Sequence, residues 1–350
     1  MTVPPSTTLA MNDVSPERIL DVGMAFWPAK VLLSAVELDL FSLLGERALT
    51  GAELQTELKL HPRANPDFFD TLVALRFLER DGDGEGARYR NSAETGTFLN
   101  KAKAGYIGGF LEMANDRLYP FWGDLTEALR TGAPQNEIKT SGAPMFEELY
   151  REPERLEQFM AAMSGVSAGN FQALAERFDF SPYRTLCDVG GASGLLSILV
   201  ARRHPHLHCA TADLPGATAI AARRIAAEGL SERIEAVPLD FFAEPLPKAD
   251  VITMGLILHD WSLEKKRQLI AAAYEALPKG GVFIVVEHLI DDARRSNAFG
   301  LMMSLNMLIE FGDAFDYTGA DFDRWCREAG FSRTEVLPLM GPAGAGIAYK

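Results

Sequence analysis

The chain has 350 residues, of which 47% are hydrophobic and 23% charged, and its formal net charge is −14. This composition is typical of a globular protein large enough for two domains, and the negative charge disfavours nucleic acid or an anionic membrane as the main partner. Three widely spaced cysteines (Cys187, Cys209 and Cys326) make no metal-binding pattern. They indicate reduced thiols in a cytoplasmic protein.

The N-terminal segment begins with a tail and continues with apolar helices. Residues 1–18 lack the basic and apolar regions of a signal peptide, and no apolar run reaches the ~18 residues of a membrane span. Residues 17–45 hold two apolar helical patterns, and the second is apolar around more of its circumference than one core-facing side needs. This extra face predicts a subunit interface, with a deep core helix as the alternative.

A winged-helix pattern follows. A capping box predicts a helix over 50–58, a second helix opens at 65–67, and a turn with a short strand is predicted over 81–90. The inner side of the second helix is expected to carry Phe68, Leu72, Leu75 and Leu78. Phosphate binding requires a positive face, whereas this helix and wing are mixed or acidic. We therefore expect no nucleic-acid partner.

The second half of the chain alternates strands with helices. Residues 105–178 are predicted to be helical, and strands are predicted at 184–189, 208–212, 234–237, 250–254, 282–287, 333–337 and 346–350. Five strand–helix units followed by a hairpin predict an α/β fold, a doubly wound sheet with an antiparallel last strand.

The first strand of this sheet ends in Asp188 and breaks into Gly190, Gly191 and Gly194. Glycines let the backbone turn with positive φ and let a ligand approach the main chain. Ligands of open α/β sheets bind beyond the carboxyl ends of the strands. The turn therefore predicts the site of a nucleotide-like cofactor.

Further acids indicate which cofactor binds. Asp213 closes the second strand, where it can accept hydrogen bonds from ribose hydroxyls, and Asp240 with Phe241 follows the third strand as an acceptor and a ring for adenine. Such an acidic pocket would repel a pyrophosphate and attract a sulfonium and an ammonium group. The pattern predicts S-adenosylmethionine and not NAD.

A histidine at the end of the fourth strand is the predicted general base. The unperturbed pKa of histidine lies nearest neutral pH, so His259 can take up and release a proton. Glu287 ends the fifth strand and Asp316 lies in a later loop, where carboxylates can fix the imidazole tautomer and stabilise the imidazolium. A structural role for His259 is the alternative. Its place at a strand end facing the predicted cofactor favours catalysis.

Together these motifs resemble the plant-type and bacterial small-molecule O-methyltransferases, which include the acetylserotonin, caffeate and hydroxyneurosporene methyltransferases. The resemblance covers nearly the whole chain and rests on residues 35–41, 188–191, 213–215, 240–242 and 259–261. It implies a Rossmann-like methyltransferase sheet preceded by a mainly α winged-helix dimerisation domain. The implied division is a dimerisation domain over 1–104, a helical linker contributing to the substrate pocket over 105–178, and a catalytic domain over 179–350.

The resemblance also implies roles for individual residues. S-adenosylmethionine, which becomes S-adenosylhomocysteine, would be bound without a metal by Asp188, Gly190, Gly191, Asp213, Leu214, Asp240 and Phe241, with Met163 and Ser164 near its methionine end. His259 would be the general base, with Glu287 and Asp316 as its orienting acids. The acceptor pocket would be lined by Met302, Met303, Asn306 and Met307. The family implies a homodimer in which one subunit borders the other's pocket.

Two residues depart from the family pattern. Gly255 stands where Lys or Arg is frequent, so one cofactor contact is missing or replaced. Asp316 stands where Glu is usual, and the shorter acid is expected to reach His259 less well.

The predicted reaction is transfer of a methyl group to a hydroxyl of a small aromatic or polyketide-like metabolite. One alternative is methylation of the thioether of a small methylthio hydroxy acid, on the route to dimethylsulfoniopropionate. In that reaction His259 would only position the acceptor. Another alternative is a non-catalytic dimeric scaffold that binds the cofactor.

Overall fold

The computed structural model describes residues 14–142 and 149–350. It divides into two compact units, residues 1–115 and 116–350. Most of the predicted N-terminal tail lies outside the described residues. The functional division at residues 104 and 178 stays a prediction.

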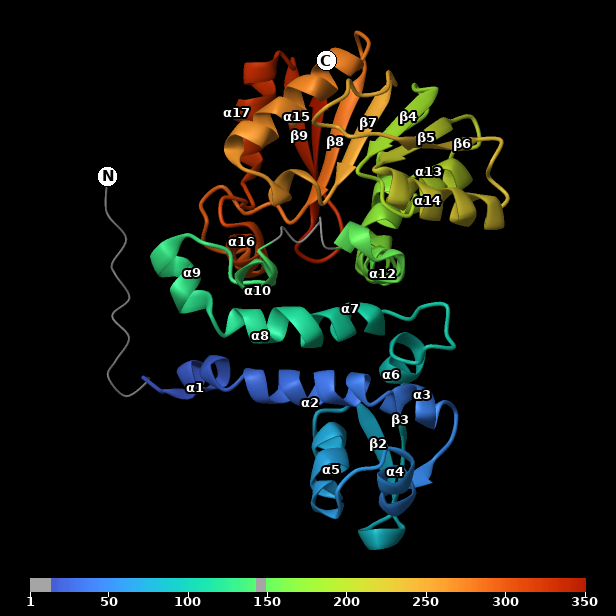
Figure 1. Ribbon diagram of the computed structural model, residues 1–350, viewed down its shortest axis with the longest axis vertical. Helices are drawn as coiled ribbons and strands as arrows, with labels where there is room; N and C mark the ends of the chain where they lie inside the picture. The colour runs from blue at the N-terminus through green and yellow to red at the C-terminus, as the bar shows by residue number, and fades with distance from the viewer. Residues whose placement is uncertain (1–13, 143–148) are drawn as a thin grey trace, which may run out of the picture. The chain divides into compact units, whose positions relative to one another are not determined.

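The N-terminal unit is mainly helical around a small sheet (Figure 1). Its strands pair antiparallel in the order β1-β3-β2. The elements are α1 (Glu17–Gly23), α2 (Phe26–Glu37), α3 (Leu40–Leu44), β1 (Leu49–Thr50), α4 (Gly51–Glu57), α5 (Asp67–Ala74), β2 (Leu78–Asp81), β3 (Arg88–Asn91), α6 (Ala93–Phe98) and α7 (Gly108–Met113). The capping box predicted before α4 is present, since Thr50 and Glu53 exchange side-chain and backbone hydrogen bonds.

The predicted second helix of the wing motif was too long. α5 ends at Ala74, and Arg76 turns the chain with a φ of 65°. Leu78 therefore opens β2, where its side chain is buried. The hairpin β2–β3 carries arginines, but Arg80 lies 2.8 Å from Asp70 and Arg90 lies 2.6 Å from Glu79. These acids neutralise the face that would otherwise attract phosphates.

The first two helices expose large apolar side chains. Ile19 and Val22 are each 74% exposed and Trp27 is 62% exposed in the single chain. The segment Glu17–Glu37 is also long and apolar enough, by length and composition, to cross a membrane. The prediction that no apolar run reaches this length was therefore wrong, because only a few charges interrupt the two helices. This exposed apolar face therefore requires another surface that buries it.

The C-terminal unit is built on a seven-stranded sheet. Its order is β6-β5-β4-β7-β8-β10-β9, parallel except that β10 runs antiparallel between β8 and β9. The strands are β4 (Thr185–Val189), β5 (His208–Asp213), β6 (Ile234–Pro238), β7 (Val251–Gly255), β8 (Val282–Glu287), β9 (Arg333–Pro338) and β10 (Gly344–Tyr349). The predicted doubly wound sheet with an antiparallel last strand is confirmed.

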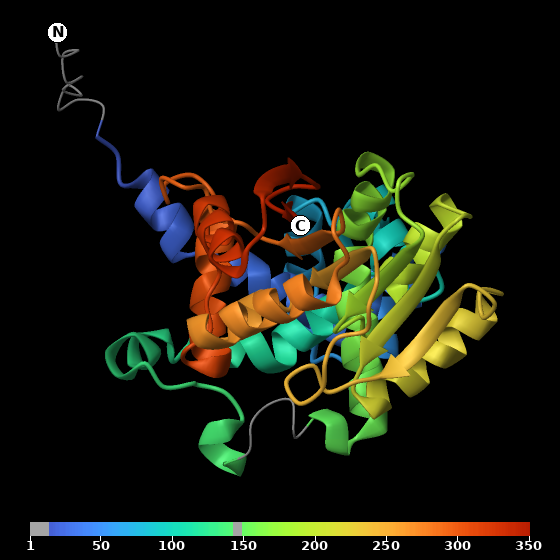
Figure 2. The same cartoon turned by 90° about the horizontal axis from the view of Figure 1, so that it is seen from above.

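Helices cover both faces of this sheet (Figures 1 and 2). The helices from residue 114 onward are η4 (Ala114–Leu118), α8 (Tyr119–Trp122), α9 (Leu125–Thr131), α10 (Ile138–Ser141), α12 (Pro153–Arg177), α13 (Leu195–Arg203), α14 (Pro215–Ala227), η5 (Leu258–Asp260), α15 (Leu263–Ala276), α16 (Ala298–Phe311) and α17 (Gly319–Ala329). Residues of α12, α13 and α14 form one core with the sheet, and residues of α15 and α17 form the other. The carboxyl ends of β4 to β8 are left to carry the site.

Candidate active site

The glycine turn after β4 is built so that a ligand can approach its backbone. Gly190 has a φ of +69°, and its N–H donates to the carbonyl of Ala212 at 2.8 Å. A Cβ at this position would lie 2.3 Å from Cδ1 of Ile257. Only glycine therefore fits here without a shift of its neighbours.

Two buried acids flank this turn. Asp188 accepts a 2.7 Å hydrogen bond from Thr253, and burial raises the pKa of the Asp188 carboxyl to about 7 against that bond. Asp213 accepts from the backbone N–H of Ala192 at 2.9 Å and from the hydroxyl of Tyr150 at 3.0 Å. Burial also raises the pKa of Asp213. The ends of β4 and β5 thus place two buried acids beside the turn, and a cation bound there would favour their ionised forms.

The third predicted acid lies farther out. Asp240 is exposed, and its carboxylate accepts a 3.0 Å hydrogen bond from the backbone N–H of Phe242. The ring of Phe241 lies 3.8 Å from the place where a Cβ of Gly190 would be. The ring of Phe241 therefore stands at the edge of the glycine turn, one residue after an exposed carboxylate.

Of the two residues predicted near the methionine end, one reaches the turn. Ser164 on α12 lies 2.7 Å from Ser193, hydroxyl to hydroxyl, and Ser193 belongs to the turn itself. Met163 is half-buried on the same helix. Leu214 follows Asp213 directly, and its N–H donates to that carboxylate at 2.7 Å.

His259 lies in the 3-10 helix after β7, surrounded by carboxylates. Its Nδ1 is 3.4 Å from Oδ1 of Asp316, and its Nε2 is 3.3 Å from Oδ1 of Asp260. Glu287 accepts a 3.1 Å hydrogen bond from the N–H of Leu258, one residue before the histidine. His259, Glu287 and Asp316 are all buried. The structure therefore brings the three predicted catalytic residues together.

The electrostatics of this cluster follow from burial and from opposed charges. Burial alone would lower the pKa of His259, but Asp260, Glu287 and Asp316 outweigh it and raise that pKa to about 10. Burial raises the pKa of Glu287 to about 7 and that of Asp260 to about 6, against the charge of His259. The cluster can hold and release a proton at the carboxyl end of β7.

Asp260 belongs to the quoted histidine motif, but the sequence reasoning gave it no role. A second missed residue is Lys266 on α15, which is fully buried. Its ammonium donates to the carbonyl of Trp261 and lies 3.8 Å from the ring centre of Phe315. Burial lowers the pKa of Lys266 to about 8, although the acids of the cluster oppose this. This lysine is a buried counter-charge between the two loops that carry the cluster.

A metal ion is a further possibility for these side chains. His259, Glu287 and Asp316 each offer one ligand atom, and these atoms lie within 4.8 Å of one another. Zinc ligands stand about 2.0 to 2.2 Å from the metal, so the atoms would have to draw closer to share one ion. Nδ1 of His259 and Oδ1 of Asp316 face each other at 3.4 Å, and neither has a hydrogen-bond partner among the described residues.

The predicted acceptor residues lie on α16. Met302 is exposed, Met303 and Asn306 are half-buried, and Met307 is buried. The indole N–H of Trp122 donates to Asn306 at 2.9 Å, and the N–H of Asp316 donates to Ser304 of the same helix at 3.2 Å. The helix is thereby tied to the cluster of His259. Met307 is the most buried of the four. The hydrogen bond between Trp122 and Asn306 was not predicted.

The two departures from the family pattern have structural explanations. A Cβ at Gly255 would lie 2.8 Å from the ring of Phe171, so this ring fills the space of a longer side chain. Asp316 does reach His259, at 3.4 Å, which is longer than an ideal hydrogen bond.

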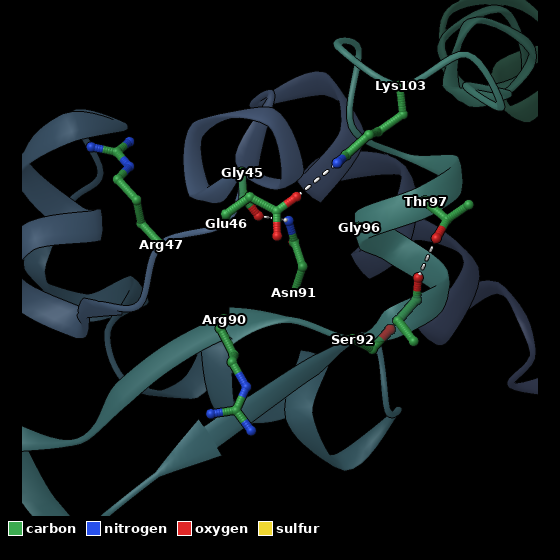
Figure 3. Close-up of a pocket in the computed structure, with 10 residues that line it drawn as sticks. Gly45, Glu46, Arg47, Arg90, Asn91, Ser92, Gly96, Thr97 and Lys103 are labelled. Carbon is green, nitrogen blue, oxygen red and sulfur yellow. Dashed lines mark hydrogen bonds and ion pairs between the residues drawn. The ribbon is translucent and has the colours of Figure 1, made fainter.

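One surface pocket lies elsewhere, in the N-terminal unit (Figure 3). Ion-paired and hydrogen-bonded side chains line it, including Lys103 and Glu46 at 2.7 Å, and Asn91, whose amide donates to the carbonyl of Gly45 at 3.0 Å. None of the predicted site residues lines this pocket.

The sheet, the glycine turn between two buried acids and the histidine cluster define a nucleotide-cofactor enzyme of the S-adenosylmethionine type. Residues 122–332 match the O-methyltransferase domain, and residues 20–101 match the O-methyltransferase dimerisation domain. The chain belongs to the O-methyltransferase family and is an S-adenosylmethionine-dependent enzyme.

Individual relatives share nearly the full length. The tetracenomycin polyketide synthesis 8-O-methyl transferase TcmO of Streptomyces glaucescens is 39% identical, over 96% of this chain and 97% of that protein. The N,N-dimethyltransferase OxyT of Streptomyces rimosus is 37% identical, over 93% of each. The crystal structure of human N-acetylserotonin methyltransferase in complex with S-adenosylmethionine has a TM-score of 0.89 and 28% identity, covering 98% of this chain and 99% of that one.

Proposed function

We propose that this enzyme methylates a hydroxyl group of a small aromatic or polyketide-like metabolite, with His259 as the general base. The observation that carries the proposal is the position of His259, within 3.4 Å of Asp316 and at the same strand edge as the acidic cofactor turn. The similarity to TcmO, an 8-O-methyl transferase of polyketide synthesis, supports the acceptor class.

In this proposal the residues at the carboxyl edge of the sheet bind different parts of the cofactor. Bound S-adenosylmethionine supplies a methyl group on a positively charged sulfur. Asp213 and Leu214 hold the ribose, Asp240 and Phe241 hold the adenine, and the remaining predicted contacts come from Asp188, Gly190, Gly191, Met163 and Ser164. The residues fit this cofactor because the turn admits no Cβ at Gly190 and the two buried carboxylates suit a cation.

His259 accepts the proton of the acceptor hydroxyl. A phenol has a pKa near ~10, so a base assists while the proton moves during attack rather than removing it beforehand. Asp316 fixes the ring through Nδ1, and Glu287 stabilises the imidazolium from the end of β8. Met302, Met303, Asn306 and Met307 support the acceptor from α16, and most of the rate comes from alignment of oxygen, carbon and sulfur.

The acceptor atom is tested by a turnover screen with the purified enzyme. We expect release of S-adenosylhomocysteine with phenols or hydroxylated polyketides. Turnover only with amines would favour N-methylation, the reaction named for the similar protein OxyT. Turnover only with methylthio hydroxy acids would favour S-methylation. Binding of S-adenosylhomocysteine in calorimetry without turnover of any acceptor would favour the non-catalytic cofactor-binding scaffold.

We further propose a cytoplasmic homodimer that binds neither nucleic acid nor a membrane. The exposed apolar side chains of α1 and α2 would be covered by the second subunit, because soluble proteins rarely leave such a patch open. The match of residues 20–101 to a dimerisation domain supports this cover.

A charge placed in this apolar face should break the dimer. We expect Trp27→Glu to convert the protein to a monomer in light scattering, since the glutamate would be buried without a partner. Ala52→Glu, at an exposed position of α4, is the matched control and should stay dimeric. Equal masses for the two variants would place the interface elsewhere, and a monomeric wild type would refute the homodimer.

A further inference from the structure

We propose that Arg224 binds the carboxylate of the methionine part of S-adenosylmethionine. Arg224 belongs to α14, outside the motifs that identify the family, and the sequence reasoning assigned it no role. The proposal deepens the proposed function and rests on the cofactor lying along the carboxyl edge of the sheet.

The Arg224 guanidinium joins three elements at the glycine turn. Its Nη1 donates to the hydroxyl of Ser193 at 2.6 Å and to that of Ser164 at 3.3 Å, and the two hydroxyls lie 2.7 Å apart. Ser193 is in the turn itself, and Ser164 is on α12. A ligand group that reaches these two serines also reaches the guanidinium.

Among the described residues, no acid forms an ion pair with the Arg224 guanidinium. Within residues 14–142 and 149–350, the ion pairs of the structure do not include Arg224. Glu228, one turn further along α14, is paired with Arg202. Burial lowers the pKa of Arg224, although the charge of Glu228 opposes it. A half-buried arginine bonded only to hydroxyls retains donors for an anion, and carboxylates are strong acceptors for it.

The order of the strands shows which part of the cofactor comes near. Neighbouring strands at this edge come in the order β6, β5, β4, β7. Asp240 follows β6, Asp213 ends β5, the glycine turn follows β4 and His259 follows β7. If the adenine lies at Asp240 and the ribose at Asp213, the sulfur must lie by the turn to present its methyl group toward His259. The amino-acid tail then extends from the sulfur along Ser193 and Ser164.

Charge balance supports this placement. The carboxylate is the one anionic group of S-adenosylmethionine, whereas the turn is flanked by the buried carboxylates of Asp188 and Asp213. These acids attract the sulfonium and ammonium groups but repel the carboxylate. Arg224 supplies the opposite charge at the point where the tail passes.

The test compares two ligands that differ only in the carboxylate. S-adenosylmethionine and decarboxylated S-adenosylmethionine are titrated into the full-length protein by calorimetry. We expect Arg224→Met to raise the Kd for S-adenosylmethionine by about tenfold to a hundredfold, the range for loss of a charge-assisted hydrogen bond. The Kd for the decarboxylated ligand should stay within about twofold of the wild-type value. Arg224→Lys should retain part of the wild-type preference.

Arg223→Met is the matched control, because Arg223 is exposed on the same helix and pairs with Glu157 at 3.0 Å. It should bind both ligands as the wild type does. An equal loss of affinity for both ligands in Arg224→Met, or no loss of affinity for either, would overturn the assignment while leaving the proposed function intact. If Arg224→Met does not fold, a preference for the carboxylated ligand that Arg224→Lys retains at least in part supports the charge contact, and a vanished preference contradicts it. A wild type that binds neither ligand would refute the proposed function itself.

Discussion

His259→Ala is expected to lower kcat on a hydroxyl acceptor by about 10²- to 10⁴-fold, the range that general acid–base catalysis supplies. Affinity for S-adenosylhomocysteine should stay near that of the wild type, because His259 lies after β7 and the cofactor acids lie after β4, β5 and β6. Steady-state kinetics and calorimetry measure the two effects separately. Near-normal turnover with folded, ligand-binding protein would refute the general-base role.

The pH dependence provides the control that separates a base from a structural histidine. The carboxylates raise the pKa of His259 to about 10 against the effect of burial. The imidazole must be neutral to accept a proton, so kcat/KM should rise as pH rises from neutrality toward about 10. Asp316→Asn removes one carboxylate and lowers that pKa, so the rise should move to lower pH. A structural histidine would leave the profile in place.

The sheet was predictable because its signals are local. Each predicted strand of the sheet lies within two residues of the observed one at either end, since apolar runs bounded by glycine, proline and acids mark where parallel strands stop. The end of α5 was not predictable in this way. Leu75 and Leu78 continue the helical spacing, and only the positive φ of Arg76 turns Leu78 into a strand residue.

The positions of the candidate site residues were predictable where a chemically suitable residue ends a strand, as at Asp188, Asp213 and Glu287, or follows one closely, as at His259. Roles for Lys266 and Arg224 were not predicted because charged residues on helices normally face solvent. A signal for Lys266 was present, since Lys266, Leu269, Ile270 and Ala273 have the spacing of one buried helix face. What the sequence could not show is that this face meets three carboxylates brought in by β7, β8 and a distant loop.

Lys266→Met should both destabilise the protein and change its pH profile. The substitution keeps the buried stem but leaves Asp260, Glu287 and Asp316 without their neighbouring cation. Removing one partner from a buried charged group costs about 3 to 5 kcal/mol, so the free energy of unfolding should fall by about 3 kcal/mol in denaturant titration. Lys265→Met, at an exposed position next to it, should change stability by less than about 0.5 kcal/mol.

The pH profile shows whether the lysine acts on catalysis as well as on folding. Lys266 lowers the pKa of Asp260 and of Glu287, because its positive charge favours their ionised forms. Without it the cluster holds its protons more tightly, so the rise of kcat/KM should move to higher pH, opposite to the shift expected for Asp316→Asn. Loss of stability with an unmoved profile would restrict Lys266 to packing. A shift to higher pH would show that this buried charge sets the proton affinity of the histidine cluster.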